Sequence, residues 1–429
     1  AYSNGHGDNR GLVAYHNKNG MAAGWIRSSV AYSVKTGGDG ARALTQKTLG
    51  EGLGINPGND RFTTFRDHLG NLEFIRESKE LCEKGLYVEL GPYQYHVFLD
   101  FRQIHDNEQR HYARLTAYLN GRGVPSVEDA LREIFLQPIH HAFGALFDRS
   151  LLQRLLDTRT ALAENSIETI PQDLLREVEQ KTLHLLREIK KYTRGKGDEQ
   201  WIVGGITHMV STVAAFDALK ERLVSRSPDI SVKVMSVLES DSVNKDLAFF
   251  TLYGWALIHG LGKAVSEEGD VQETSRSWID EWAFGRLINN AFGDLGFDEY
   301  SISRTMVIIK IFTSHQSWYR RKVIADTRDI LVSFLRDSEV QRFLDVNRHL
   351  DILWFNKEGF ETLLAWMLLT ACIRIESDPS VTGEERDGEI DMARNIVAAL
   401  YEAFEKSDYQ IEKLVESLQN RSGTPAVTD

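Results

Sequence analysis

The stretch GLYVELGPYQYHVFLDFRQIHD, residues 85–106, decides the fold, because strand patterning ends within it and helical patterning follows it. Every second residue from Tyr93 to Leu99 is aromatic or aliphatic, and Gly91-Pro92 supplies a turn before this run. Alternation of this kind indicates a half-buried strand, so the runs on either side of the turn predict an antiparallel hairpin that closes a sheet. His105-Asp106 then forms the junction to the first helix, with Asp106 as its cap.

The residues before this junction are rich in glycine and in strand-forming runs. Fifteen of the 33 glycines lie in residues 1–104, and tight turns need glycine whereas helix interiors disfavour it. Aromatic and β-branched runs bounded by turn residues predict strands over 10–17, 24–34, 85–91 and 93–101. Residues 71–85 have helical spacing that ends at Gly85, which predicts a helical insertion in the sheet domain.

The chain after residue 104 is patterned as helices almost throughout. The segment SVEDALREIFLQP (126–138) predicts a helix that Ser126 caps, with Asp129 three residues on, and that ends before Pro138. The fold class is therefore α+β by segments. We expect an N-terminal antiparallel β-sandwich over 1–104, a large all-α helical domain over 105–420 and a mobile tail over 421–429.

The composition argues against several classes of partner. Fifty Lys+Arg against 62 Asp+Glu give a net charge of −12, which disfavours binding to nucleic acid and to an anionic membrane surface. The two cysteines, Cys82 and Cys372, lie far apart, so there is neither a disulfide framework nor a CxxC pair. The apolar run at 247–262 is shorter than the ~20 residues of a membrane span. We expect a cytoplasmic protein with no cofactor and no metal ligands.

Two stretches carry a resemblance to a known family. AYSNGHGDNRGLVAYHN (1–17) is similar to the stretch that opens the β-sandwich called domain C, which follows the catalytic barrel in the α-amylase superfamily of glycoside hydrolases. The matching places are Ala1-Tyr2, Gly7-Asp8, Leu12-Val13-Ala14-Tyr15 and Asn17. The stretch at 85–101 likewise resembles the final strands of such a domain. The resemblance covers about a quarter of the chain, and residues 105–420 have no counterpart in ordinary amylases.

This resemblance implies a parent enzyme whose barrel precedes residue 1. Glycoside cleavage in the superfamily needs carboxylates at the ends of barrel strands, and a barrel needs ~250 residues that this chain cannot spare beside its helices. The strings FRDH (65–68) and FRQIHD (101–106) mimic superfamily motifs, but Ile104 stands where an Asn belongs. We therefore expect no catalytic residue in this chain.

The function expected from the resemblance is that of a non-catalytic C-terminal region of an enzyme acting on α-glucans. The sandwich would pack on the missing catalytic barrel, and the helices would serve docking or oligomerisation. An apolar surface left without its barrel predicts self-association. The candidate barrel-facing residues are Ala1, Tyr2, Leu12, Trp25 and Ile26. The alternative is a free-standing sandwich-plus-helices interaction protein without carbohydrate activity.

Several motifs in the helical region allow a functional and a structural interpretation. Trp278 and Trp282 lie four residues apart and are candidates for stacking on sugar rings, although such a pair more often belongs to a core. HGLGK (259–263) resembles a phosphate loop but lacks the following Ser/Thr, so we interpret it as a site of close helix packing or as a helix end. SHQSWYRRK (314–322) is interpreted as a solvated helix end.

Metal ligation by HDNEQRH (105–111) is disfavoured, because a helix turns His105 and His111 to different faces.

Overall fold

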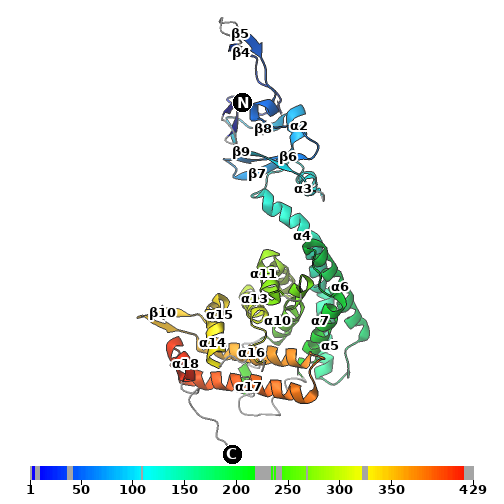
Figure 1. Cartoon of the computed structure of the whole chain (residues 1–429), viewed down its shortest axis with the longest axis vertical. Helices are drawn as coiled ribbons and strands as arrows, with labels where there is room; N and C mark the ends of the chain where they lie inside the picture. The colour runs from blue at the N-terminus through cyan, green and yellow to red at the C-terminus, as the bar shows by residue number, and fades with distance from the viewer. Residues whose placement is uncertain are drawn as a thin grey trace, which may run out of the picture. The chain divides into compact units, whose positions relative to one another are not determined.

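The computed structural model divides the chain into two compact units, Ala1–Gln137 and Pro138–Asp429. It describes residues 2–4, 10–35, 42–107, 110–217, 233–234, 236–237, 244–266, 269–320 and 327–419. The expected tail at 421–429 lies outside these residues. Figure 1 shows antiparallel strands in the first unit and helices in the second, which confirms the α+β fold class.

The first unit is built on a five-stranded antiparallel sheet in the order β1-β2-β9-β6-β7, accompanied by the two-stranded sheets β3-β8 and β4-β5. The strands are β1 (Tyr2–Asn4), β2 (Gly11–Tyr15), β3 (Ala22–Ile26), β4 (Tyr32–Lys35), β5 (Arg42–Thr45), β6 (Arg61–Asp67), β7 (Leu72–Glu77), β8 (Leu86–Leu90) and β9 (Tyr95–His105). The helices are α1 (Leu49–Leu53), α2 (Ser78–Glu83), α3 (His111–Leu119) and the first part of α4 (Val127–Leu146). The second unit thus begins within α4.

One apolar core joins the two sheet layers. The inward side chains of β8, such as Leu86 and Val88, share a cluster with Leu12 of β2 and Phe98 of β9. Phe65 of β6 lies at its centre, with ring centroids 5.0–5.5 Å from those of Phe74, Phe98 and Phe101. The alternation expected over 93–99 therefore has the opposite phase in the structure, because Phe98 is buried in this core whereas Tyr93 and Tyr95 are exposed.

The long strand β9 carries a bulge at its middle. Its register with β6 shifts between Thr64, opposite Arg102, and Arg66, opposite Leu99. Asp100 lies in this bulge with a φ of 57°, and its carboxylate pairs with Arg66 at 3.0 Å. The first residues of β9 pair with β2 through one edge, and the residues from Phe98 on pair with β6 through the other, with the bulge lying in the β6 pairing.

Strands give way to helices after His105, whereas the first compact unit extends to Gln137. The reason is that α3 and the start of α4 cover the outer face of the sheet. Leu115 and Leu119 of α3 and Val127 of α4 pack with Phe62 and Ile75 in a second apolar cluster. The domain boundary expected near residue 104 therefore marks a change of secondary structure, while the compact unit ends later.

Two expectations about helices are wrong. Residues 72–77, expected within a helical insertion, form strand β7, because Phe74 lies opposite Phe65 and joins the core rings. Only Ser78–Glu83 of that segment is helical. Helix α4 begins after Ser126, whose hydroxyl accepts from the Asp129 N–H at 3.1 Å, but it continues through Pro138. The run predicted as one strand over 24–34 is divided between β3 and β4.

The edge strand β7 is covered by the connection between α3 and α4. Glu73 and Val124 exchange two backbone hydrogen bonds, at 2.7 and 2.9 Å. The Glu73 carboxylate also accepts the Val127 N–H at 2.8 Å, at the start of α4. This contact ties the sheet to the helix that leads into the second unit.

The described part of the second unit consists of helices with one small hairpin, β10 (Asn347–His349) and β11 (Ile352–Trp354). After α4 the helices are α5 (Arg149–Ala163), α6 (Gln172–Thr193), α7 (Glu199–Ala214), α10 (Lys245–Ile258), η2 (Leu261–Ala264), α11 (Val271–Glu281), α12 (Phe284–Asp294), α13 (Glu299–Ser314), α14 (Thr327–Arg336), α15 (Ser338–Phe343), α16 (Lys357–Glu376), α17 (Gly383–Glu405) and α18 (Ile411–Gln419). Among the described residues, no helix combines the length and apolar composition that a membrane crossing requires.

Helices α10 and α16 form the centre of the second unit. Nearly every residue of α10 from Leu247 to Ile258 is buried, and α16 is buried along most of its length. Two large polar side chains of α10 have partners inside this core: Tyr253 Oη donates to Leu146 O at 2.7 Å, and Trp255 Nε1 donates to Phe312 O at 2.9 Å. Helix α7 contacts both α10 and α16.

Gly85 gives a test of the first unit. It ends α2 with a φ of 88°, and a Cβ there would lie 2.1 Å from Ile26 O. Gly85→Ala should therefore lower the free energy of unfolding by about 3 kcal/mol or more, because the cost of a positive φ for alanine adds to the cost of the collision with the Ile26 backbone. Faster hydrogen exchange of the β8 amides is the measurement.

Gly20→Ala is the matched control. Gly20 also has a positive φ, 139°, but no atom lies within 4 Å of the added Cβ. This variant should lose only about 1–2 kcal/mol. Equal losses in the two variants would show that the collision with Ile26 is not what requires glycine at 85.

Candidate functional site

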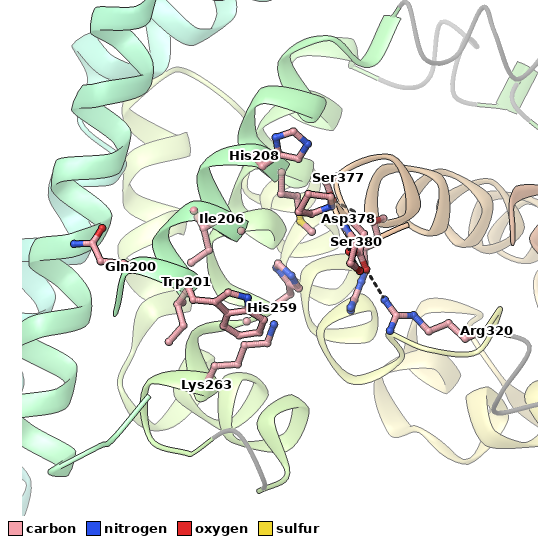
Figure 2. Close-up of a pocket in the computed structure, with 17 residues that line it drawn as sticks. Gln200, Trp201, Ile206, His208, His259, Lys263, Arg320, Ser377, Asp378 and Ser380 are labelled. Atoms are coloured by element: carbon pink, nitrogen blue, oxygen red, sulfur yellow. Dashed lines mark hydrogen bonds and ion pairs between the residues drawn. The ribbon is translucent and has the colours of Figure 1, made fainter. Parts of the chain in front are cut away.

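A pocket of about 660 Å³ lies in the second unit where the first turns of α7 face the ends of α10 and α16. Figure 2 shows Trp201 and Lys263 along one side and Arg320 with Asp378 along the other. Its lining residues are Gln200, Trp201, Ile202, Gly204, Gly205, Ile206, His208, Met209, His259, Gly260, Lys263, Arg320, Arg374, Ser377, Asp378, Pro379 and Ser380.

The aromatic side of the pocket is held by a close backbone contact. Gly197, just before α7, donates its N–H to Ala264 O at 3.2 Å, and a Cβ at Gly197 would lie 1.9 Å from Lys263 O. Asp198 then caps α7 by accepting the Trp201 N–H at 3.1 Å. As a result the Lys263 Nζ lies 4.3 Å from the centre of the Trp201 ring, a cation–π contact.

The opposite side of the pocket carries two arginines and one carboxylate. Arg320 donates to Asp378 Oδ2 at 3.2 Å, while Asp378 Oδ1 accepts the Ser380 N–H at 3.0 Å. Arg374 donates to the neutral Oε1 of Gln316, and no ion pair to Arg374 occurs among the described residues. Burial lowers the pKa of Arg374, and the nearby Arg320 charge acts in the same direction, whereas Tyr319 and the Asp378 charge oppose this shift. The site therefore holds more positive charge than its own carboxylate compensates.

His259 lies between these two sides as a neutral imidazole. Its Nδ1 lies 3.0 Å from Ala256 O, and since a carbonyl only accepts, Nδ1 carries the proton and Nε2 does not. Burial lowers the pKa of His259 to about 3, and the charges of Arg374 and Lys263 add to that shift. Gln316 Nε2 donates to His259 O at 2.8 Å, which links the histidine to Arg374.

A second candidate surface lies on the first unit and consists of three exposed tyrosines, Tyr15, Tyr93 and Tyr95, which we call the tyrosine surface. Tyr15 of β2 lies opposite Tyr95 of β9, and Tyr93 precedes β9 with a φ of 56°. Their exposed fractions are 63%, 66% and 51%, and they line a shallow hollow of about 340 Å³. Exposed rings around a hollow suit an aromatic-stacking ligand or a protein partner.

The predicted barrel-facing residues have different environments. Trp25 is 42% exposed, and its ring lies 5.5 Å from that of Tyr87, its 46% exposed neighbour on β8. Ile26 is partly buried against the core. The prediction of an exposed Leu12 is wrong, because this side chain is 2% exposed in the core of the first unit. Ala1 lies outside the described residues, and Tyr2 is described only as the start of β1, opposite Val13.

The tryptophan pair predicted for sugar stacking is also buried. Trp278 and Trp282 stack on each other with centroids 4.0 Å apart, and Trp282 meets Tyr192 and Phe284 edge to face. Both are core residues of the second unit. Their ring faces are covered, so the sugar-stacking interpretation is corrected to the structural one.

The junction after β9 has a structural role. Asp106 Oδ1 accepts the Tyr112 N–H at 2.8 Å and Oδ2 accepts the Ala113 N–H at 3.1 Å, so Asp106 caps α3 as expected. His105 lies near Asp60, whereas His111 Nδ1 contacts Asn107. No group of three metal-ligating side chains occurs within the described part of the chain.

Two of the segments that form the pocket, HGLGK and SHQSWYRRK, were predicted from the sequence to have structural roles. HGLGK contributes His259 and Lys263 to the lining of the pocket, and SHQSWYRRK contributes Arg320. Gln316 of the second segment is buried behind them, between His259 and Arg374.

The interpretation of HGLGK as a helix end holds, since α10 ends at Ile258, but that of SHQSWYRRK as a solvated end is wrong in that Gln316 and Tyr319 are buried rather than solvated. Neither interpretation predicted that the two segments meet. The available signal was the Gly204-Gly205 pair inside a helical pattern, which weakens a helix unless something needs the space.

The neutral state of His259 predicts a loss of stability in acid. The unfolded chain protonates this histidine below its ordinary pKa near 6.5, whereas the folded pKa is about 3, so folding becomes less favourable as pH falls between these values. Between pH 7 and pH 5 this group should cost about 2 kcal/mol. His259→Asn, which keeps an N–H near the position of Nδ1, should reduce that loss in denaturant unfolding.

Tryptophan fluorescence reports this transition, since seven of the eight tryptophans lie in the second unit. His141→Asn, at an exposed position of the same unit, is the control and should retain the acid loss of the unaltered protein. An identical difference between pH 7 and pH 5 in His259→Asn and the unaltered protein would contradict the assignment.

The two candidate sites differ in chemistry: one is a pocket with basic and aromatic walls, and the other is an exposed aromatic surface. The first suits a small anionic ligand, and the second suits a sugar chain or a protein partner. No family model, curated protein or solved structure matches this chain, so its functional assignment rests on these side chains.

Proposed function

We propose that this chain is the non-catalytic C-terminal portion of an α-amylase-like glycoside hydrolase or transglycosidase that acts on α-glucans. In this proposal the first unit corresponds to domain C and contacts the catalytic barrel, and the helical unit serves docking or oligomerisation. The resemblance at residues 1–17 and 85–101 supports it. Those stretches fall on β1, β2, β8 and β9, and β2 and β9 are adjacent in the five-stranded sheet.

The observation that carries the proposal is the exposure of aromatic rings on the first unit. Monomeric proteins expose few contiguous apolar patches, and such patches usually mark an interface or a ligand surface. The Trp25–Tyr87 pair suits the contact with a catalytic domain, which typically buries about 600–1,500 Å². The tyrosine surface suits contact with an α-glucan, because pyranose faces stack on aromatic rings.

The chemistry of the parent enzyme belongs to its barrel in this proposal. The nucleophile and acid/base carboxylates of such enzymes flank the scissile bond at the ends of barrel strands. We further propose a cytoplasmic location, which the low cysteine content, Cys82 and Cys372, favours.

Glucan contact is tested by native electrophoresis of the chain in gels with and without soluble starch. Starch should retard the chain, and Tyr15→Ala or Tyr95→Ala should each weaken the retardation by about threefold to tenfold, the effect of losing one ring contact. Tyr118→Ala, which removes another exposed tyrosine of the first unit, should change nothing.

The same incubation should release no reducing sugar from starch. Reducing sugar that persists through repurification would overturn the non-catalytic assignment. Retardation that is equal in the Tyr15, Tyr95 and Tyr118 variants would remove the tyrosine surface from the proposal.

Self-association tests the Trp25–Tyr87 pair separately. The isolated chain should form concentration-dependent dimers or larger species in sedimentation velocity, because the rings lose contact with water on association. Trp25→Ser combined with Tyr87→Ser should shift the chain towards monomer, whereas Tyr118→Ser should not. A monomer at every concentration, or association unchanged by the double substitution, would contradict the interface.

A further inference from the structure

The pocket of the second unit has a feature that the fold does not require. Gly204 and Gly205 lie inside α7 and line the pocket, and a Cβ on either would meet no atom within 4 Å. Glycine inside a helix is about 1 kcal/mol less favourable than alanine, and nothing here excludes an alanine. Glycine is instead useful where a ligand approaches the backbone closely.

The charges of the pocket point to an anion. Among the described residues that line it, Arg320 and Arg374 are accompanied by one carboxylate, Asp378, and Lys263 lies on the opposite side, on a chain whose net charge is −12. Asp378 is already shared between Arg320 and the Ser380 N–H, and Arg374 donates to the neutral Gln316. The Nε of Arg320 is buried and has no acceptor among the described residues. Guanidinium groups in this state match the oxygens of a phosphate, which accept paired N–H bonds.

The remaining walls suit a ring. Trp201 is 57% exposed, and the Lys263 ammonium lies against its ring. Ile206, Met209 and the open faces of the two glycines extend this apolar side. A volume of about 660 Å³ is ample for a monosaccharide or nucleoside with one phosphate.

We propose that this pocket binds a small phosphomonoester that carries a ring, with the phosphate at Arg320 and Arg374 and the ring between Trp201 and the Gly204-Gly205 face. The ligand is a phosphorylated sugar or a nucleoside monophosphate, and the two share this chemistry. The inference is independent of the α-glucan proposal, since it rests on the second unit alone.

Calorimetric titration of the full chain tests it with four probes: glucose 6-phosphate, adenosine 5′-monophosphate, inorganic phosphate and glucose. At least one ring phosphate should bind with a Kd below about 1 mM and more tightly than inorganic phosphate, while glucose should not bind. The tighter of the two ring phosphates identifies the source. The absence of binding by both ring phosphates, or equal binding of inorganic phosphate, overturns the proposal.

Three variants assign the binding to this pocket. Arg320→Gln should weaken both ring phosphates by about tenfold or more. Trp201→Ala should weaken a ring phosphate but leave inorganic phosphate unchanged. Gly205→Ala should raise the thermal unfolding midpoint, because alanine favours the helix, and yet weaken binding. This opposite change in stability and affinity separates a ligand surface from a merely structural site.

Each variant has a control of the same chemistry elsewhere in the second unit. Arg348→Gln removes an exposed arginine of β10, Tyr300→Ala removes an exposed ring of α13, and Gly388→Ala fills open space inside α17. All three should bind like the unaltered chain. Binding that is equally strong in Arg320→Gln and Arg348→Gln, or in Gly205→Ala and Gly388→Ala, would overturn the placement of the ligand.

Discussion

The second unit depends on two helices that are apolar on nearly every side. A helix that is hydrophobic all round has no face to offer to water, so α10 and α16 must be enclosed by other helices. Helix α13 covers part of α10, α17 lies along α16, and α7 contacts both (Figure 1). The few polar groups inside, such as those of Tyr253 and Trp255, are bonded to carbonyls of neighbouring helices, which fixes how those helices approach.

This requirement also explains where the pocket lies. Helices α10 and α16 leave the core at His259 and Ser377, and their ends bring backbone and charged side chains to the edge of a buried region. Helix α7 lies across this edge, and its two glycines, Gly204 and Gly205, are exposed there. The low polarity around His259 keeps its imidazole neutral. The same burial disfavours the charged guanidinium of Arg374. Polar groups that the apolar core cannot accommodate are thus found together at the pocket.

Local signals predicted elements better than they predicted contacts between distant segments. The Ser126 and Asp106 caps and the strands around Gly91 depend on neighbours in sequence, and they were predicted. Strand β7 was missed because Phe74 is drawn into a sheet by Phe65, a partner that helical spacing cannot reveal. The pocket was missed for the same reason: residues 201, 259, 320 and 374 come from four helices or connections, and no periodicity links them.

The bridge between Glu73 and Val124 has a consequence for how copies of this chain meet. A strand at the edge of a sheet presents unpaired N–H and C=O groups, which invite another extended chain to add to it and can seed fibres. Here Val124 occupies that position at Glu73, and the Glu73 carboxylate holds the Val127 N–H, so backbone addition at β7 is blocked where α4 begins. At Glu73, contact with another copy must therefore proceed through side chains, which disfavours open-ended growth by strand addition at this place.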